Sequence, residues 1–218
     1  MRLRSPQHRC QSILAAATLC LLLATSELKA EDKPLPLFDG RTFENWEGDT
    51  EKSFRIEDGA IVGGTVQAAI PRNEFLCTRR SFGNFVLRLK FRLVGDKTNA
   101  GVQFRSRRIP NHHEVSGYQA DLGNPGWWGC LYDESRRNQV LAQSDMAALR
   151  KTLRTDDWND YRIQVEGRRI RLFINGVETI DYTEKDESIE QNGVLCLQIH
   201  GGPPGEAWYK DISIQELP

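Results

Sequence analysis

The chain has too few cysteines for a small disulfide-stabilised scaffold. Its 218 residues include five cysteines, and two of these, Cys10 and Cys20, lie close to the N-terminus. Cys77, Cys130 and Cys196 remain, and three cysteines allow at most one disulfide. Their spacing matches no zinc-binding pattern. Buried free thiols are the favoured interpretation, because unpaired cysteine is among the most buried residue types, and a pairing among the three stays open.

The chain also lacks an excess of charge of either sign. It has 29 Lys and Arg against 30 Asp and Glu, which gives a net charge of −1. A protein that binds nucleic acid presents a basic face, so nucleic acid is not an expected partner.

No hydrophobic run is long enough to span a bilayer. The longest covers residues 13–24 and is interrupted only by Thr18, whereas a membrane helix needs roughly 20 residues. This run follows Arg2, Arg4 and Arg9 and precedes small residues, a pattern typical of a secretory signal. We therefore expect a signal peptide over residues 1–30, cleaved between positions 26 and 30. The remaining 31–218 would then form one exported domain, periplasmic or extracellular, without a membrane span and of undetermined oligomeric state.

Helical periodicity is nearly absent, and alternation of apolar and polar residues takes its place. Only residues 145–153 suggest a short helix. Strands are expected over residues 85–93, 161–165, 170–174, 195–199 and 208–217. Asp58-Gly59 and Asn175-Gly176 are typical of two-residue hairpin turns. About ten to twelve short strands at this chain length favour an all-β fold, best described as a two-sheet antiparallel jelly-roll sandwich.

Three expected strands carry an unusual set of polar residues on one face. They cover residues 100–106, 117–123 and 194–200, and strand pleating puts alternate residues on one side. The polar positions are Gln103, Arg105, Gln119, Asp121, Gln198 and His200. Amide, guanidinium, carboxylate and imidazole groups suit the hydroxyls of a sugar. The alternative is that these positions are simply solvated strand faces.

The segment 116–134 adds aromatic rings and carboxylates to this picture. Trp127 and Trp128 are adjacent and flanked by glycines, so one could stack on a ligand while the other packs in the core. Trp46, Trp158 and Trp208 are interpreted as structural. The carboxylates of Asp133 and Glu134 would point to opposite sides of a strand, and one of them near Asp121 would form an acid–base pair. A salt bridge from either one to Arg136 or Arg137 is the alternative.

A short cluster of His112, His113 and Glu114 comes after Ile109-Pro110-Asn111, which places it in a loop. These are metal-ligand residue types, but three consecutive residues in a loop are weak grounds for a metal site.

Several motifs, in this order, resemble one bacterial family. They are Phe38-Asp39-Gly40 with Trp46, Asn99-Ala100-Gly101-Val102 with Arg105, Gly117-Tyr118-Gln119 with Asp121, Trp158-Asn159 with Tyr161, Asn175-Gly176, Leu197-Gln198-Ile199-His200-Gly201, and Trp208-Tyr209-Lys210-Asp211-Ile212. From about Pro36 to Leu217 the chain resembles the 3-keto-disaccharide hydrolase domain, formerly a domain of unknown function. The resemblance implies export, a concanavalin A-like (lectin/glucanase) jelly roll, and cleavage of glycosides oxidised at C3.

The resemblance also implies roles for the candidate residues. A base near C2, Asp121 or His200, would remove the proton acidified by the C3 ketone. Arg105, with Gln119 or Gln198, would hold the enolate oxygen, and Glu134 would protonate the leaving group. The remaining candidates for substrate binding are Gln103, Tyr118, Trp127 and Trp128.

The chain departs from the family at one position, because many members have an acid where this chain has Gln119. That departure keeps a second reading open, a lectin-like domain that binds glycans without turnover. A third reading is a structural or adhesive domain. The sequence requires no cofactor, and the resemblance leaves a divalent metal open.

Overall fold

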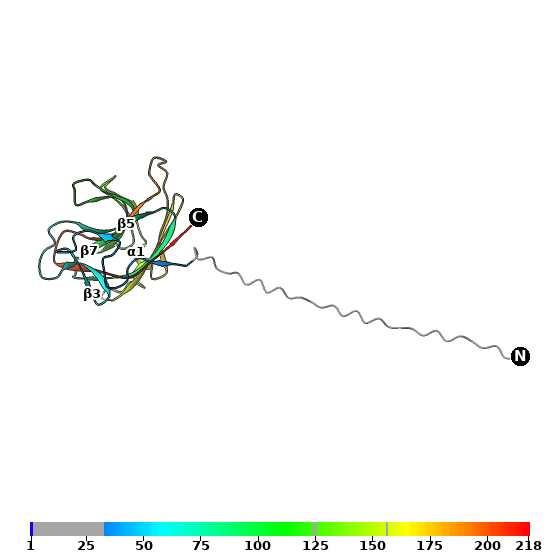
Figure 1. Ribbon diagram of the computed structural model, residues 1–218, viewed down its shortest axis with the longest axis horizontal. Helices are drawn as coiled ribbons and strands as arrows, with labels where there is room; N and C mark the ends of the chain where they lie inside the picture. The colour runs from blue at the N-terminus through cyan, green and yellow to red at the C-terminus, as the bar shows by residue number, and fades with distance from the viewer. Residues whose placement is uncertain (2–32, 124–125, 156) are drawn as a thin grey trace.

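The computed structural model describes Met1 and residues 33–123, 126–155 and 157–218. The expected signal peptide, with Cys10 and Cys20, lies outside these residues. Two antiparallel sheets pack face to face (Figure 1), which confirms the predicted all-β, two-sheet sandwich. Within the described residues there are fifteen strands, more than the number expected from the sequence.

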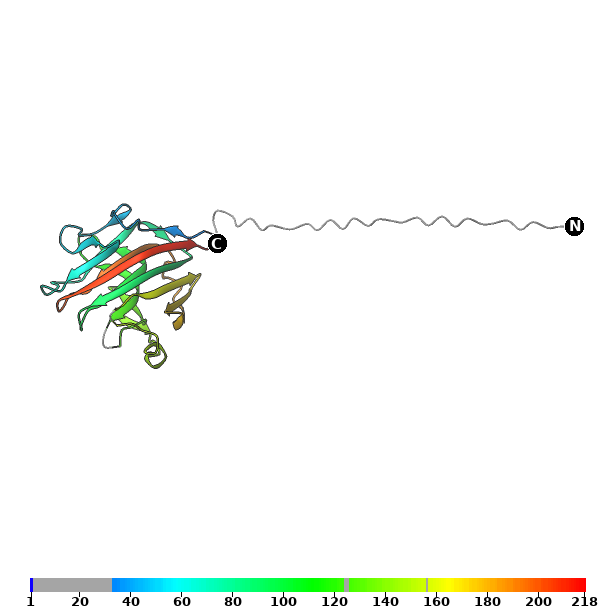
Figure 2. The same cartoon turned by 90° about the horizontal axis from the view of Figure 1, so that it is seen from below.

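The larger sheet has eight strands in the order β13-β12-β11-β6-β15-β4-β3, with β1 paired to β15. Figure 2 shows its long strands running side by side. The bounds are β1 (Leu35–Pro36), β3 (Phe54–Glu57), β4 (Ala60–Thr65), β6 (Phe85–Val94), β11 (Asn159–Glu166), β12 (Arg169–Ile174), β13 (Val177–Thr183) and β15 (Gly205–Glu216).

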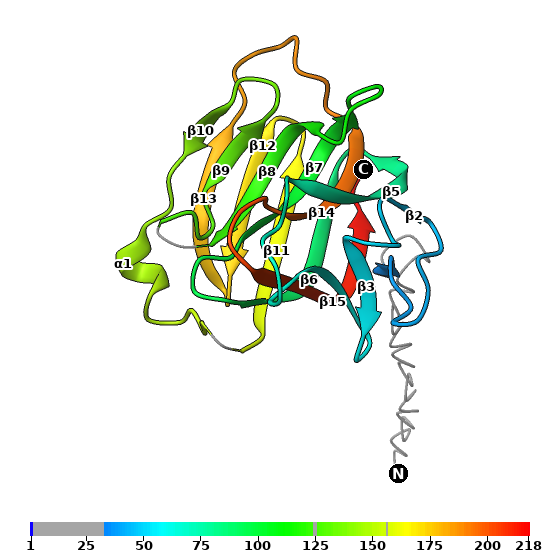
Figure 3. The same cartoon turned by 90° about the vertical axis from the view of Figure 1, so that its left-hand side faces the viewer.

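The other sheet has seven strands in the order β10-β9-β8-β7-β14-β5-β2. In Figure 3 its strands β7, β8 and β9 lie across the larger sheet. The bounds are β2 (Trp46–Glu47), β5 (Glu74–Phe82), β7 (Asn99–Arg108), β8 (Val115–Gly123), β9 (Leu131–Glu134), β10 (Gln139–Ala142) and β14 (Gly193–Ile199).

Period-two alternation builds the core between the sheets. Leu87, Leu89 and Phe91 of β6 point inward and pack with Val102 of β7 and Ala120 of β8. Burying one apolar face per strand is the main stabilising term of such a sandwich. The polar faces of β7, β8 and β14 therefore lie on the outer side of the seven-stranded sheet.

The two predicted hairpin turns are confirmed. Asp58 and Gly59 have φ of 50° and 72°, and they join β3 to β4. Asn175 and Gly176 have φ of 49° and 82°, and they join β12 to β13. Turns of this geometry match the right-handed twist of the flanking strands.

The expected helix is present but shorter than predicted. It is α1 (Met146–Leu149), capped by Asp145, whose side chain accepts hydrogen bonds from the backbone N–H groups of Ala147 and Ala148. Leu149 buries its side chain against the core. No helix in the described ranges is long and apolar enough to cross a membrane.

Two of the three remaining cysteines are paired, which corrects the expectation of buried free thiols. Cys77 on β5 and Cys196 on β14 are direct cross-strand partners and form a disulfide. Cys130 is the free, buried cysteine among the described residues. The disulfide ties neighbouring strands of the seven-stranded sheet beside the polar residues singled out above.

Candidate functional site

A pocket of about 250 Å³ opens on the seven-stranded sheet and gathers many of the candidate residues. It is lined by Asn99, Gln119, Asp121, Trp127, Tyr132, Glu134 and His200. These residues come from β7, β8, β9, the β8–β9 connection and the residue that follows β14. The predicted meeting of Asp121, Glu134 and His200 on one surface is therefore confirmed.

Strand register explains why these side chains share a face. Tyr132 pairs directly with Gln119, Gln119 with Gln103, and Gln103 with Cys196. Directly paired residues of an antiparallel sheet project to the same side. Gly101 makes room in this row, because a Cβ there would lie 2.7 Å from Cγ and Cδ of Gln119. The Gln119 side chain can thus lie across the sheet toward Asp121.

Asp121 is almost completely buried, with 2% of its surface exposed. Its Oδ1 accepts a 2.5 Å hydrogen bond from Nε2 of Gln119, and its Oδ2 lies 3.5 Å from the Cys130 thiol, which donates to it. Burial, with a contribution from the charge of Glu134, raises the pKa of Asp121 to about 7 although both hydrogen bonds favour the carboxylate. A carboxyl group with this pKa can exchange protons at neutral pH.

Glu134 is the second carboxyl of the pocket. Its Oε2 accepts a 3.3 Å hydrogen bond from Nε2 of Gln198. Burial, followed by the charge of Glu114, raises the pKa of Glu134 to about 7. Both carboxyls of the pocket are therefore poised near neutrality, as expected when like charges are buried together.

The rim of the pocket adds an imidazole and an aromatic ring. His200 is exposed, and its Nδ1 lies 2.6 Å from the carbonyl oxygen of Gly201. In the neutral ring this contact places the proton on Nδ1 and leaves Nε2 as an acceptor. Trp127 is half-buried and meets the ring of Tyr132 edge-on at 6.0 Å. Aromatic faces of this kind can stack on the C–H surface of a sugar.

Sequence reasoning missed two residues of the lining, Asn99 and Tyr132. The sequence did contain a signal for Tyr132, because it lies two residues from Glu134 on the same strand. Its side chain must therefore lie on the same side of β9 as that of Glu134. Asn99 begins β7 and holds the backbone N–H of His200 through its carbonyl oxygen at 3.0 Å. Its position just ahead of the alternating strand concealed it.

Gln103 lies beneath the pocket and does not line it, which corrects its assignment to substrate binding. It is fully buried, its Nε2 donates to Oε1 of Gln119, and its Oε1 accepts a 3.1 Å hydrogen bond from Ser106. Ser106, Gln103, Gln119 and Asp121 thus form a chain of hydrogen bonds in which each donor orients the next amide. Gln198 is likewise fully buried, and it supports Glu134 from below.

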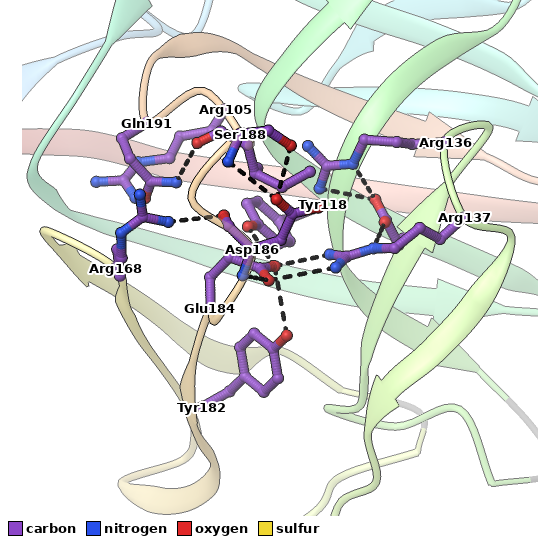
Figure 4. Close-up of polar contacts among 12 residues, drawn as sticks. Arg105, Tyr118, Arg136, Arg137, Arg168, Tyr182, Glu184, Asp186, Ser188 and Gln191 are labelled. Atoms are coloured by element: carbon purple, nitrogen blue, oxygen red, sulfur yellow. Dashed lines mark hydrogen bonds and ion pairs between the residues drawn. The ribbon is translucent and has the colours of Figure 1, made fainter.

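Arg105 does not join the pocket, so the prediction that it shares a face with Gln103 is wrong. The residue has φ of 46° at an irregularity in the pairing of β7 with β8 and β14. A bulge of this kind breaks the alternation that parity arguments assume. The side chain instead donates to the carbonyl oxygens of Gly83 and Gly167 at 2.9 and 2.6 Å. It also donates to Gln191 (Figure 4).

Tyr118 and Trp128 are also placed away from the pocket. Tyr118 is fully buried, stacks on Phe104 at 5.5 Å and donates its hydroxyl to Glu184 at 2.8 Å (Figure 4). Trp128 is 3% exposed and packs 6.1 Å from Phe91 in the core. The side chain of Tyr118 points inward because strand alternation puts it on the core side of β8. At the two adjacent tryptophans, the turn puts Trp128 on the core side and Trp127 on the pocket side.

The alternative for Asp133 is confirmed. Its buried carboxylate pairs with Arg136 at 2.8 Å and with Arg137, away from the pocket. His112 and His113 stack on each other, and Nδ1 of His113 lies 3.1 Å from the carbonyl oxygen of Asn73. Within the ranges that the structure describes, no group of three His, Cys, Asp or Glu residues could hold a metal ion.

Comparisons with known proteins identify the family and the fold of the chain. A family model described as a 3-keto-alpha-glucoside-1,2-lyase-like domain matches residues 33–215. No curated protein matches the chain by sequence.

Several solved structures share the fold at low identity. A candidate glycosyl hydrolase from Parabacteroides distasonis is 20% identical, with a TM-score of 0.65 over 84% of this chain and 93% of its own. The carbohydrate-binding module CBM66 from Bacillus subtilis is 12% identical, with a TM-score of 0.62 over 79% of this chain and 96% of its own. A Bacillus subtilis protein with a galectin-like fold is 9% identical, with a TM-score of 0.64 over 84% of this chain and 98% of its own.

These three likenesses establish a galectin-like, jelly-roll sandwich and nothing finer. The family match is different in kind, because it spans nearly all of the described residues. The chain therefore belongs to the family of 3-keto-alpha-glucoside-1,2-lyase-like domains.

Proposed function

We propose that this protein is an exported carbohydrate-active enzyme that cleaves glycosides oxidised to a ketone at C3. One observation carries the proposal: two carboxyl groups, Asp121 and Glu134, face one sugar-sized pocket, and the pKa of each is raised to about 7. Groups with such pKa values can act as base and acid in the same reaction at neutral pH. The family match supports the substrate class.

In the proposed reaction Asp121 removes the proton at C2, which the neighbouring ketone makes acidic. The electron pair first forms the enolate of the C3 ketone, and the enolate then collapses to restore the ketone and form a double bond between C1 and C2 as the bond from C1 to the glycosidic oxygen breaks. Glu134 gives its proton to that oxygen. Water then adds its oxygen to C1 and a proton returns to C2, so the net reaction is hydrolysis.

The hydrogen bonds support this division of roles. Asp121 receives two donors, from Gln119 and Cys130, which stabilise its charged form and orient the oxygen that takes the proton. Glu134 accepts a longer hydrogen bond from Gln198 and a backbone hydrogen bond from Ser135, and its pKa of about 7 keeps it partly protonated at neutral pH, as the acid of the reaction requires. The amide nitrogen of Gln119 carries a second N–H, which is free to donate to the enolate oxygen that forms at the substrate ketone. The role that the resemblance implied for Arg105 together with Gln119 or Gln198 thus falls to Gln119 in this proposal.

Export is part of the proposal. The N-terminal sequence is typical of a secretory signal, and disulfides such as Cys77–Cys196 persist in oxidising compartments. A periplasmic or extracellular enzyme of this class would meet oxidised glycans directly.

Asp121→Asn and Glu134→Gln test the proposal. Each should lower kcat/KM on a 3-keto-disaccharide by about 10²–10⁴-fold, the usual contribution of a general acid or base. Neither should lower the melting temperature, because each removes a buried charge without changing shape. Gln139→Ala, at an exposed position of β10 outside the pocket lining, is the matched control. Unchanged turnover in both carboxyl variants would end the proposal.

The lectin-like reading makes a different prediction. Gln119, in place of an acid, would then complete a site that binds glycans without turnover. Unoxidised glycans would quench Trp127 fluorescence with saturation, and the Trp127→Phe variant would lose this signal, while no 3-keto-glycoside would be cleaved by the wild type. A structural or adhesive domain would show neither response.

A further inference from the structure

We propose that a second pocket on the same sheet face is a subsite for the next sugar units of a longer, uncharged glycan. This inference rests on the proposed function, because it assigns the part of the substrate that extends beyond the pocket of Asp121 and Glu134. The second pocket has a volume of about 390 Å³ and lies over the far ends of β7 and β14. We refer to it as the distal pocket.

Strand register places both pockets on one face. Glu47, which lines the distal pocket, pairs with Cys77, Cys77 pairs with Cys196, and Cys196 pairs with Gln103. The same row continues from Gln103 to Gln119, which lines the first pocket. A ligand lying on this surface can therefore contact both.

The two pockets are also close. Ser106 lines the distal pocket and donates to Gln103, which donates to Gln119, which donates to Asp121. Gln103 and Ser106 are three residues apart on β7, which corresponds to about 10 Å along a strand. A glycan that extends beyond the sugar unit bound over Asp121 would thus pass over the amide side chains of Gln119 and Gln103 and reach the distal pocket.

The bulge at Arg105 builds this second pocket. Because Arg105 turns away from the sheet face, it can bind Gln191 in the β13–β14 loop, residues 184–192 (Figure 4). Glu190 and Asn192, which flank Gln191 in that loop, line the distal pocket. Gly193 fits against the bulge, since a Cβ there would lie 2.5 Å from the backbone of Arg105. Arg105 therefore shapes the distal pocket by holding the β13–β14 loop, and it does not line the pocket of Asp121 and Glu134.

The loop is held at its other end as well. Glu184 accepts hydrogen bonds from the hydroxyl of Tyr118 at 2.8 Å and from Arg137 at 2.7 Å (Figure 4). Arg168 donates to the carbonyl oxygen of Asp186 at 2.7 Å. A loop fixed at both ends gives a preformed wall, as ligand pockets usually have.

The charges of the distal pocket indicate an uncharged polar ligand. Arg107 pairs with Glu190, and Arg108 pairs with Glu47 at 3.0 Å. All four residues line the pocket, so its formal charges cancel. A sulfate, phosphate or uronate group would gain little there, because each guanidinium already has a carboxylate partner. Sugar hydroxyls can instead bind the free edges of these pairs.

Two lining residues remain available for such hydroxyls. Within the described residues, the side chains of Ser81 and Asn192 have no hydrogen-bond partner, and both are exposed in the distal pocket. A hydroxyl and an amide can each donate and accept, which matches the groups of a sugar. Removing them disturbs no internal contact, so they are suitable test positions.

The test compares substrate lengths in the double variant Ser81→Ala/Asn192→Ala. The probes are glucose disaccharides and tetrasaccharides in the α-1,4 and β-1,4 series, oxidised at C3 of the non-reducing unit. In at least one series, wild-type kcat/KM should be higher for the tetrasaccharide, and the double variant should lose about tenfold on it, as expected for one or two lost hydrogen bonds. Turnover of the disaccharide should stay unchanged, and Gln139→Ala should change neither. Equal kcat/KM for both lengths in both series, or an equal loss on both, would overturn the subsite.

A binding measurement separates this inference from the proposed function. Calorimetric titration with the unoxidised tetrasaccharides does not require turnover, and it should show about tenfold weaker binding to the double variant. If the enzyme turns over the disaccharide but shows no effect of length, only the distal subsite fails. If nothing is turned over yet the tetrasaccharide binds through Ser81 and Asn192, the distal subsite stands and the catalytic proposal fails. If neither probe distinguishes the variant from the wild type, the distal subsite is wrong.

Discussion

At the scale of single residues, the proposed chemistry depends on which groups contact the two carboxyls of the pocket. Asp121 has one amide and one thiol donor, and Glu134 has one amide donor and the backbone N–H of Ser135. Neither has an arginine partner, whereas Asp133, one residue from Glu134, has two. Burial, which no arginine offsets, raises the pKa of both pocket carboxyls. A paired carboxylate stabilises a fold, and an unpaired buried one can move a proton.

The raised pKa values predict how stability depends on pH. Asp121 and Glu134 have ordinary pKa values of 3.8 and 4.5 and folded values of about 7. Between about pH 4 and pH 7 these two carboxyls therefore bind more protons in the folded protein than in the unfolded chain. The free energy of unfolding should fall as the pH rises through this window. Urea unfolding at half-unit steps should show this fall, and Asp121→Asn should make it shallower. A steeper or unchanged slope in the variant would show that Asp121 is not held neutral by the fold.

Arg105 supplies a second residue-scale prediction. Its guanidinium binds Gly83, Gly167, Asn84 and Gln191 and no residue of the catalytic pocket. Arg105→Ala should lower the free energy of unfolding by about 2–4 kcal/mol, because several hydrogen bonds to a charged group are lost. Turnover of a 3-keto-disaccharide by the folded variant should stay within a few-fold of wild type. A loss of about 10²–10³-fold in kcat with normal stability would mean that Arg105 holds the enolate after all.

At the scale of elements, the β13–β14 loop is fixed by a buried ionic network. Glu184 is 2% exposed and contacts Arg137, Tyr118 and Tyr182 (Figure 4). Burial alone would raise its pKa, but the hydrogen bond from Arg137, the backbone N–H of Asp186 and the Tyr118 hydroxyl lower it to about 2. The network joins the β9–β10 turn, through Arg137, and β8, through Tyr118, to the edge strand β13 of the larger sheet, through Tyr182.

Glu184→Gln should weaken that connection. Breaking a buried ion pair by removing one partner typically costs about 3–5 kcal/mol. The sign of the pH dependence is opposite to that of Asp121. The contribution of Glu184 is present above its ordinary pKa of 4.5 and is lost as the pH falls toward about 2. Urea midpoints of wild type and variant should therefore differ at pH 7 and converge in acid. A constant difference across this range would contradict the ionic account.

Elements were the most predictable level of this structure. Alternation predicted the two-sheet sandwich, and Asp58-Gly59 and Asn175-Gly176 predicted their turns, because both signals are local. The same parity brought Gln119, Asp121, Glu134 and His200 to one pocket. It failed at Arg105, where a positive φ in a non-glycine residue breaks the pleat. Nothing in the local sequence distinguishes that bulge from a regular strand.

Parity also could not tell a pocket from the layer beneath it. Gln103, Gln198 and Gln119 share one face, but the first two are covered and only Gln119 reaches the pocket. Tyr118 belongs to the opposite, core side, together with Phe104. Depth within a sheet face depends on which long side chains lie over which, and that is a property of the packed structure.

At the scale of the whole molecule, the disulfide is the main covalent constraint. Cys77 and Cys196 are 119 residues apart in sequence. Which of three cysteines pair cannot be read from spacing, since pairing follows the strand register. The double variant Cys77→Ala/Cys196→Ala should lose about 2–5 kcal/mol of stability, as is typical for removal of a native disulfide. Wild type treated with a thiol reductant should show a similar shift in its urea midpoint. No shift in either case would mean that the disulfide does not form.

The central claim is that the pocket removes the proton at C2, and isotope incorporation tests it most directly. A 3-keto-disaccharide is hydrolysed in D₂O, and the deuterium at C2 of the released 3-keto sugar is measured by mass spectrometry and NMR against the enzyme-free exchange rate. We predict one C2 deuterium per turnover for the wild type, and neither product nor enzyme-dependent exchange for Asp121→Asn. Released sugar without enzyme-dependent deuterium at C2 would contradict the account, because the glycosidic bond would then have been cleaved without elimination.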